Sequence, residues 1–300
     1  MAKGLKTRKS SPSRFKIQDS VLGYATILPA MLVLIGFFGY PLFYEVYASF
    51  TNSTVGQPGE WVGLANYSYL VNDPAFTAAA FNTVIYVTAA QTGKFALGLA
   101  VALLLQQKMI GRNLWRSVVL LPYALPGFVA FMVWRLIYNP DVGALNIFLN
   151  QIGVLDQPIA FLSNSTWAMP GVVLATIWKG FPFWTIMFLA ALQAIPKELY
   201  EAAASDGANA YQRFKHVSFP GIRPVILIVF MLSTISTMNS FEAVWLTTGG
   251  GPGNASIIVP IYAYKSLVNF QIGQAGAAAL LLLPVILIFV LFILRRLKKA

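Results

Sequence analysis

The sequence has 300 residues, of which 57% are hydrophobic and only 10% are charged. A soluble domain carries about 25% charged residues, so this chain cannot cover a normal water-facing surface, and it is too apolar to be disordered. It has no cysteine, which excludes disulfides, thiolate metal sites and cysteine nucleophiles. The net charge of +11 does not indicate nucleic-acid binding, because no recognised nucleic-acid motif accompanies the basic residues. The composition predicts a membrane protein, and the apolar stretches described next predict that it is all-α.

Six predominantly apolar stretches are each long enough to cross a bilayer, for which a helix needs roughly 20 residues. The first is too long for the core of a signal peptide and no cleavage site follows it, so we interpret it as an uncleaved span. Together they predict a polytopic six-span domain over residues 21–300, preceded by a basic tail over residues 1–20. The predicted spans are Val21–Tyr44, Ala78–Leu105, Trp115–Tyr138, Trp167–Ala194, Pro224–Leu246 and Ile272–Leu294.

The basic residues fall almost entirely on one side of these spans. Of the 21 Lys and Arg residues, 17 lie in the N-terminal tail, the two loops on the same side and the C-terminus, whereas Lys265 alone lies in an outer segment. Loops rich in Lys and Arg stay in the cytoplasm. We therefore predict that both termini are cytoplasmic.

The predicted cytoplasmic loop over residues 195–224 has the pattern of two helices joined by a turn. Pro196 suits a first helical position, where its missing N–H has no partner, and strong helix formers follow it. Asp206-Gly207 supplies a stop because glycine adopts a positive φ without strain. Asn209 with Gln212 fits a capping box for a second short helix, and two prolines close the unit before the fifth span. The pattern predicts a helix–turn–helix elbow, for which the alternative is a helical hairpin lying on the bilayer surface.

Strings in this loop and elsewhere resemble a known family. Glu201-Ala202-Ala203, followed by Asp206-Gly207-Ala208 and then Phe219-Pro220, resembles the EAA loop of ATP-binding-cassette (ABC) importer permeases. The segments at 121–126, 178–183 and 246–252 are similar to those of carbohydrate-importer permeases of the maltose type. The resemblance implies a type I ABC importer permease fold and a location in the bacterial or archaeal cytoplasmic (inner) membrane.

The resemblance also implies partners. They are a second homologous permease, two ATP-binding-cassette ATPase subunits, an extracytoplasmic solute-binding protein and membrane lipid. No cofactor is expected on this chain, because ATP and Mg²⁺ would bind the ATPase, and the chain has no G-x-x-x-x-G-K-[ST] phosphate loop. The elbow would dock on the ATPase, with Glu201 as the charged contact, Gly207 as the turn and alanines for close packing. The implied coupling residues are Glu201, Ala202, Ala203, Asp206, Gly207, Ala208, Phe219 and Pro220.

The resemblance further implies a solute pathway on the two spans that flank the elbow, for a disaccharide, oligosaccharide or glycerol-linked sugar derivative. Ionisable groups within spans suggest a pathway or a paired structural role, and Lys179 and Glu242 lie at similar heights above the elbow. They could pair with each other or contact the solute. Small hydroxyl residues could line the pathway or simply pack helices. The candidate pathway residues are Tyr123, Thr176, Lys179, Gly180, Phe183, Ser233, Thr237, Ser240 and Glu242.

Two other functions remain as alternatives. An integral-membrane enzyme would need a nucleophile–base set, a metal cluster or paired carboxylates, and we find no candidate catalytic or metal-binding residues among one histidine and few acids. An ion-coupled secondary transporter usually has inverted repeats, and none is evident. Neither alternative explains the EAA-like string, so we predict a transport subunit rather than an enzyme.

Overall fold

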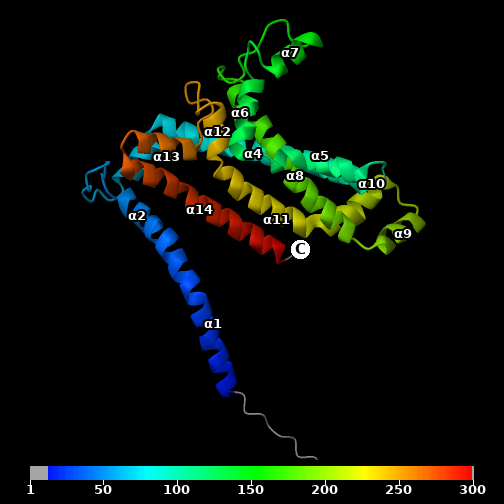
Figure 1. The fold of residues 1–300 in the computed structure, drawn as a ribbon, viewed down its shortest axis with the longest axis horizontal. Coiled ribbons are helices and arrows are strands. Elements are labelled where there is room, and N and C mark those ends of the chain that lie inside the picture. Colours follow the sequence, from blue (N-terminus) through cyan, green and yellow to red (C-terminus); the bar gives the residue numbers. More distant parts are fainter. Residues whose placement is uncertain (1–12, 108, 299–300) are drawn as a thin grey trace, which may run out of the picture.

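The computed structural model describes residues 13–107 and 109–298, and this part is built almost entirely from helices (Figure 1). The basic residues of the tail up to Lys9 lie outside the described residues. The helices and π-helical turns are α1 (Ser13–Leu34), η1 (Ile35–Gly39), α2 (Tyr40–Ser49), α3 (Ala65–Asn72), α4 (Pro74–Gln106), α5 (Arg112–Ala124), α6 (Gly127–Ile137), α7 (Ala144–Gln151), α8 (Ala168–Ala194), α9 (Lys197–Ser205), α10 (Ala210–Arg213), η2 (Phe214–Ser218), α11 (Phe219–Met238), α12 (Phe241–Thr247), α13 (Val259–Val268) and α14 (Ile272–Leu297).

Five helical segments of the described chain are long and apolar enough to cross a membrane. Two of them are composite: one runs through α1, η1 and α2, and the other through α10, η2 and α11. The other three are α4, α8 and α14, and the bent pair α5–α6 would supply a sixth. The structure therefore agrees with the predicted six spans when this pair is counted as one.

The third predicted span, Trp115–Tyr138, is broken into two helices in the structure. The chain bends by 92° between α5 and α6. Proline restricts the residue before it to extended conformations, and Leu125, which precedes Pro126, has a ψ of 141°. The break leaves the last carbonyls of α5 and the first N–H groups of α6 without helical partners.

The fifth predicted span, over 224–246, also differs from the structure. Here α11 ends at Met238, and α12 begins only at Phe241. The side chain of Asn239 donates a hydrogen bond to the Ile235 carbonyl (2.9 Å), and such local bonds compete with the helical ladder. Ser240 and Glu242 therefore do not continue the helix that carries Thr237.

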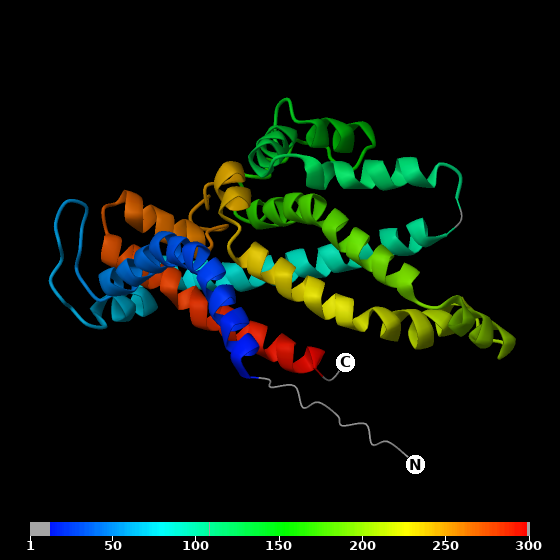
Figure 2. The same ribbon diagram turned by 60° about the horizontal axis from the view of Figure 1, so that its bottom comes forward.

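The centre of the molecule is the long contact between α4 and α8, which run side by side (Figure 2). Glycines allow the two helices to approach closely. A Cβ on Gly98 of α4 would lie only 2.6 Å from the Cβ of Trp184 on α8. One on Gly180 of α8 would lie 2.6 Å from Cε of Lys94 on α4. Gly98 therefore requires glycine for this helix spacing, and Gly180 leaves the room that the end of the Lys94 side chain occupies.

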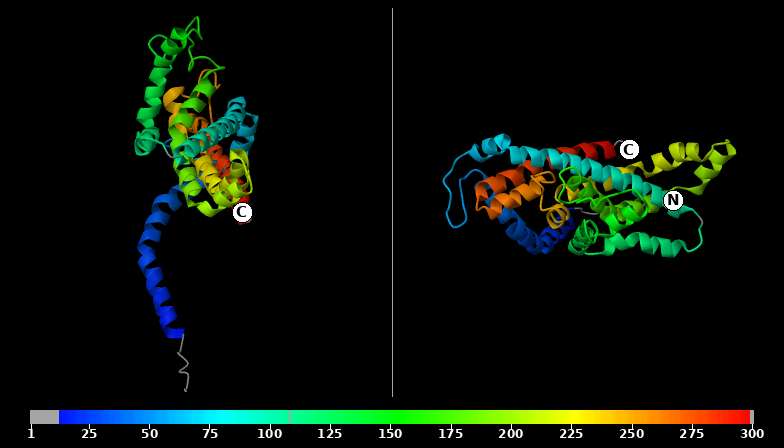
Figure 3. Two further views of the ribbon diagram at one scale, coloured as in Figure 1. Left: turned by 90° about the vertical axis from the view of Figure 1, so that its right-hand side faces the viewer. Right: turned by 90° about the horizontal axis from the view of Figure 1, so that it is seen from above.

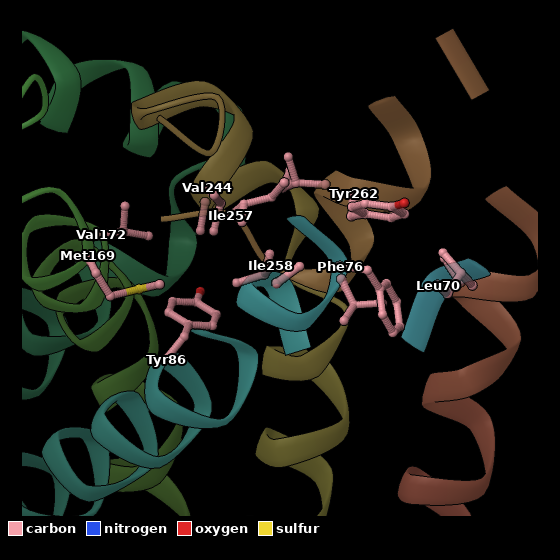
Figure 4. Close-up of a cluster of buried hydrophobic side chains, with 14 of the residues drawn as sticks. Leu70, Phe76, Tyr86, Met169, Val172, Val244, Ile257, Ile258 and Tyr262 are labelled. Carbon is pink, nitrogen blue, oxygen red and sulfur yellow. The ribbon is translucent and has the colours of Figure 1, made fainter. Parts of the chain in front are cut away.

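A hydrophobic core at one end of this contact joins α4 and α8 to the segments after α11 (Figure 4). Tyr86 of α4, Val172 of α8 and Ile258 before α13 are each fully buried there. The hydroxyl of Tyr262 on α13 donates a hydrogen bond to Asp73 at the start of α4 (2.5 Å). Burial, together with this carboxylate, raises the pKa of the Tyr262 hydroxyl, which therefore stays protonated and remains a donor.

The first composite span projects from the rest of the molecule (Figures 1 and 3). Its helix begins at Ser13, within the predicted tail. None of the residues in its most apolar window is buried inside the chain, and Phe37 and Phe43, for example, are exposed. An apolar helix without cover from its own chain must face lipid or another subunit.

Candidate functional site

The predicted elbow is present between α8 and α11, at one end of the long helices (Figure 2). Its first helix is α9, and Gly207 follows it with a φ of +79°, a conformation that favours glycine. Asn209 then caps α10: its side chain accepts from the Gln212 N–H (2.9 Å), and the Gln212 side chain accepts from the Asn209 N–H (2.8 Å). The predicted turn and capping box are thus confirmed in the structure.

The second half of the elbow differs from the prediction in two ways. Pro196 is the N-cap of α9, not its first helical residue. Pro220 and Pro224 do not close the unit, because α10, η2 and α11 follow one another without a gap from Ala210 to Met238. The π-helical turn η2 ends at Ser218, two residues before Pro220, and such turns disturb the hydrogen-bond ladder locally. The helix therefore continues through Pro220 into α11.

The predicted coupling residues lie on the outside of this elbow. Glu201, Asp206 and Gly207 are exposed in the isolated chain, and so is Phe219. A hydrogen bond between the Tyr200 hydroxyl and Ser218 Oγ (3.0 Å) ties α9 to η2. Behind them lies a hollow of about 400 Å³ that is lined by residues of α8, α9, η2 and α11. The elbow is therefore braced from within and exposes its predicted coupling residues.

A second site lies where α4, α5, α6, α8, α11 and α12 meet. They surround a cavity of about 250 Å³. Seven of the nine predicted pathway residues line it: Tyr123, Thr176, Lys179, Gly180, Thr237, Ser240 and Glu242. The structure adds four that the sequence reasoning missed: Lys94, Gly127, Phe131 and Ser236.

Thr237 is the centre of a hydrogen-bond network in the cavity wall. Its hydroxyl accepts hydrogen bonds from Lys94 Nζ (2.8 Å) and from Gln91 Nε2 (3.0 Å), and donates one to the Ser233 carbonyl (2.7 Å). Lys94 and Thr237 are both buried, at 5% and 2% exposure. This network joins α4 to α11 at the depth of the cavity.

The two predicted residues that do not line the cavity have structural roles. Ser233 Oγ accepts the indole N–H of Trp184 (3.1 Å), which links α11 to α8. The ring of Phe183 stacks on that of Tyr123 at a centroid distance of 6.1 Å. Helical spacing placed Ser233 and Thr237 on one face of α11, but the Ser233 hydroxyl is hydrogen-bonded to the buried indole of Trp184.

Lys179 and Glu242 line the same cavity without forming an ion pair within 4.0 Å in the described chain. Lys179 Nζ donates instead to the carbonyls of Tyr123 (2.9 Å) and Leu125 (2.8 Å), at the C-terminal end of α5. A Cβ on Gly127 would collide with the Glu242 carboxylate, so this carboxylate lies against the first turn of α6. Each charge therefore faces the helix end whose dipole has the opposite sign, and the pair stabilises the 92° break.

The sequence profile of the family described as binding-protein-dependent transport system inner membrane components matches residues 94–299. The chain belongs to this family. It is 35% identical to the trehalose/maltose transport system permease protein MalF of Thermococcus litoralis, over 88% of this chain and 90% of that protein. It is 32% identical to the sulfoquinovosyl glycerol transport system permease protein SmoG of Agrobacterium fabrum, over 88% of this chain and 86% of that protein.

Solved structures agree in fold. A chain of a bacterial ABC transporter involved in the import of the acidic polysaccharide alginate matches with a TM-score of 0.83 at 24% identity, covering 95% of this chain and 98% of that one. The same transporter in complex with an alginate-bound periplasmic protein matches with a TM-score of 0.82. The predicted family and ABC importer permease fold are confirmed. The protein is a multi-pass membrane permease, a transport subunit rather than an enzyme.

Of the four missed cavity residues, Lys94 had a usable sequence signal. It follows Gly93 inside a predicted span, and an ionisable residue there indicates a functional or paired role. The pathway was predicted on the two spans that flank the elbow, whereas Lys94 reaches the cavity from α4 across Gly180. Only the crossing of α4 and α8 brings it there.

Proposed function

We propose that this chain forms one half of the translocation pathway of an ABC importer for a sugar or sugar derivative, and that a separate ATPase drives it through the elbow. The observation that carries this proposal is the connection between elbow and cavity. The two helices that the elbow joins, α8 and α11, are the ones whose Thr176, Lys179 and Thr237 line the cavity. A displacement of the elbow would therefore move two walls of the cavity together.

The lengths of the two helices support such a transmission. From Thr176 to the end of α8 at Ala194 there are 18 residues, and from Phe219 to Thr237 there are again 18, each about 27 Å at 1.5 Å per residue. The network around Thr237 and the Trp184–Ser233 bond hold α4, α8 and α11 together. The helices thus act as two rigid arms of equal length.

The cavity suits a solute with hydroxyl groups. It offers hydroxyls from Ser236 and Ser240 and an aromatic face from Tyr123. Sugars are bound through hydrogen bonds to such groups and contact with flat aromatic surfaces. The names of two relatives, which refer to trehalose/maltose and to sulfoquinovosyl glycerol transport, support a carbohydrate or glycerol-linked derivative. Tyr123, Thr176, Lys179, Gly180, Thr237, Ser240 and Glu242 are the proposed pathway residues.

The remaining parts of the proposal concern assembly. A second permease would complete the pathway, two ATPase subunits would hold ATP and Mg²⁺, and an extracytoplasmic binding protein would deliver the solute. The coupling contacts would be Glu201 to Ala203, Asp206 to Ala208, and Phe219-Pro220. Both termini would be cytoplasmic, on the same side as the elbow, and residues 21–300 would form the permease domain behind a basic tail.

Reconstitution tests this function. The permease, its partner permease and the ATPase are placed in proteoliposomes, and uptake of a labelled disaccharide is measured with and without ATP and the binding protein. We expect uptake that requires all components and that is lost in the elbow variant Glu201→Lys while the complex still inserts into membranes. Uptake by the permease pair alone, driven by an ion gradient, would instead establish a secondary transporter.

A further inference from the structure

Three charged side chains line the cavity, and two of them lie at helix ends of the described chain. Lys179 donates to two backbone carbonyls at the end of α5, and Glu242 lies against the beginning of α6. Their charges are opposite, and each is directed at a helix end of suitable sign. Within the cavity these two charges balance each other.

Lys94 is the third ionisable residue, and its charge is not balanced. It is 5% exposed, and its ammonium group has one hydrogen-bond partner, the neutral hydroxyl of Thr237 at 2.8 Å. No carboxylate of the described residues lies within 4.0 Å of it. Nine of the ten acidic side chains of the sequence lie among the described ones. An ammonium group has three N–H donors, so two remain for another partner.

The surroundings of Lys94 direct its ammonium group to the cavity. The side chain passes over Gly180, where any Cβ would collide with its terminal carbons and lie 3.2 Å from Nζ. Lys94 and Gly180 both line the cavity. The helix packing thus keeps space for a charged side chain at a depth where a buried charge is costly unless it finds a partner.

From this arrangement we infer that the solute carries an anionic group, such as a carboxylate, phosphate or sulfonate on a sugar skeleton, and that Lys94 recognises it. The charges of the cavity sum to +1, because Lys94 and Lys179 outnumber Glu242. A singly charged acidic sugar would neutralise this excess and accept the two remaining N–H donors. This inference rests on the proposed function, since it specifies the solute class of the same cavity.

The test compares two solutes that differ in one group: a neutral disaccharide and the same disaccharide with a carboxylate in place of one CH₂OH group. Uptake of both is measured in proteoliposomes that contain the complete importer with its binding protein, and the readout is the ratio of acidic to neutral uptake. We expect the wild-type importer to favour the acidic disaccharide. Lys94→Gln should lower the ratio by about 10- to 100-fold, the range for one charge-assisted hydrogen bond.

Two further variants make the result specific. Lys94→Arg keeps the charge and should keep the preference for the acidic sugar. Lys265→Gln removes one positive charge from α13, away from the cavity lining, and should leave the ratio unchanged. If Lys94→Gln does not assemble, the wild-type ratio and the Lys94→Arg variant decide.

The opposite results would overturn the inference. If the wild-type importer favours the neutral disaccharide, the inference is wrong, because the cavity charge then has no role in selection. Equal losses of both solutes in Lys94→Gln would show that Lys94 pairs with a carboxylate of a partner subunit. In either case the proposed function stands, since sugar is still imported. Import of neither disaccharide by an assembled complex would overturn the proposed function and the inference together.

Discussion

The bend between α5 and α6 gives the most detailed prediction, because Lys179 of α8 is hydrogen-bonded to the end of α5. Lys179→Met keeps the length and apolar volume of the side chain but removes the hydrogen bonds to the Tyr123 and Leu125 carbonyls, which are 2.9 and 2.8 Å long. Charge-assisted hydrogen bonds contribute about 1.5–3 kcal/mol each. Because Lys179 is partly exposed, water would replace part of this contribution.

We therefore expect Lys179→Met to lower the free energy of unfolding by about 2 kcal/mol, less than the sum of the two bonds. For a chain of this size this corresponds to a fall in Tm of roughly 4–8 °C. Uptake should fall as well, because Tyr123 sits in the last turn of α5 and would lose its fixed position in the cavity.

The assay is thermal unfolding of the purified complex in detergent, followed by uptake in proteoliposomes. Lys265→Met is the matched control, since Lys265 lies on α13 and is not among the cavity residues. A Lys179→Met complex that unfolds within 1 °C of wild type, with unchanged uptake, would refute the role assigned to this lysine at the break.

Three further variants test other parts of the structure. Gly207→Pro, at a φ of +79° that proline cannot adopt, should abolish uptake and weaken ATPase association; wild-type co-purification with the ATPase would contradict the docking assignment. Gly98→Leu should separate α4 from α8 at Trp184 and cost at least about 1–3 kcal/mol, seen as a lower Tm, whereas unchanged stability would mean that the helices are not in close contact. Ser233→Ala should leave the buried Trp184 indole N–H without an acceptor, which costs about 1–3 kcal/mol of stability. We expect a lower Tm with an unchanged KM for uptake. A raised KM at normal stability would instead make Ser233 a solute contact.

Much of the fold follows from the sequence, because the bilayer fixes how long an apolar helix must be. The breaks are harder to predict. Pro126 indicates the bend. A prediction from hydropathy averages over a whole span, however, so a single proline does not interrupt the predicted helix. The same averaging joined α11 to α12 across Asn239, whose competing side-chain bond is visible only in the structure.

The elbow was predicted better than the cavity, for a physical reason. Turns and caps are local, so Gly207 and the Asn209–Gln212 pair could be identified from neighbouring residues alone. The cavity depends on where distant helices cross. Helical rise placed Lys179 and Glu242 at similar heights, but Lys179 is bonded to backbone carbonyls at a break that the hydropathy pattern did not predict, and Glu242 lies beside that break.

The central claim is that the elbow meets the ATPase, and a site-specific crosslink tests it most directly. The chain has no cysteine, so Ser205→Cys on α9 would carry the only thiol of this subunit, and Asn164→Cys in the predicted outer segment before α8 is the control. With a thiol-to-amine reagent on the assembled importer, we predict a permease–ATPase crosslink from Ser205→Cys and none from Asn164→Cys. An importer that transports solute but gives no crosslink from Ser205→Cys, or gives one from Asn164→Cys, would contradict the proposed coupling.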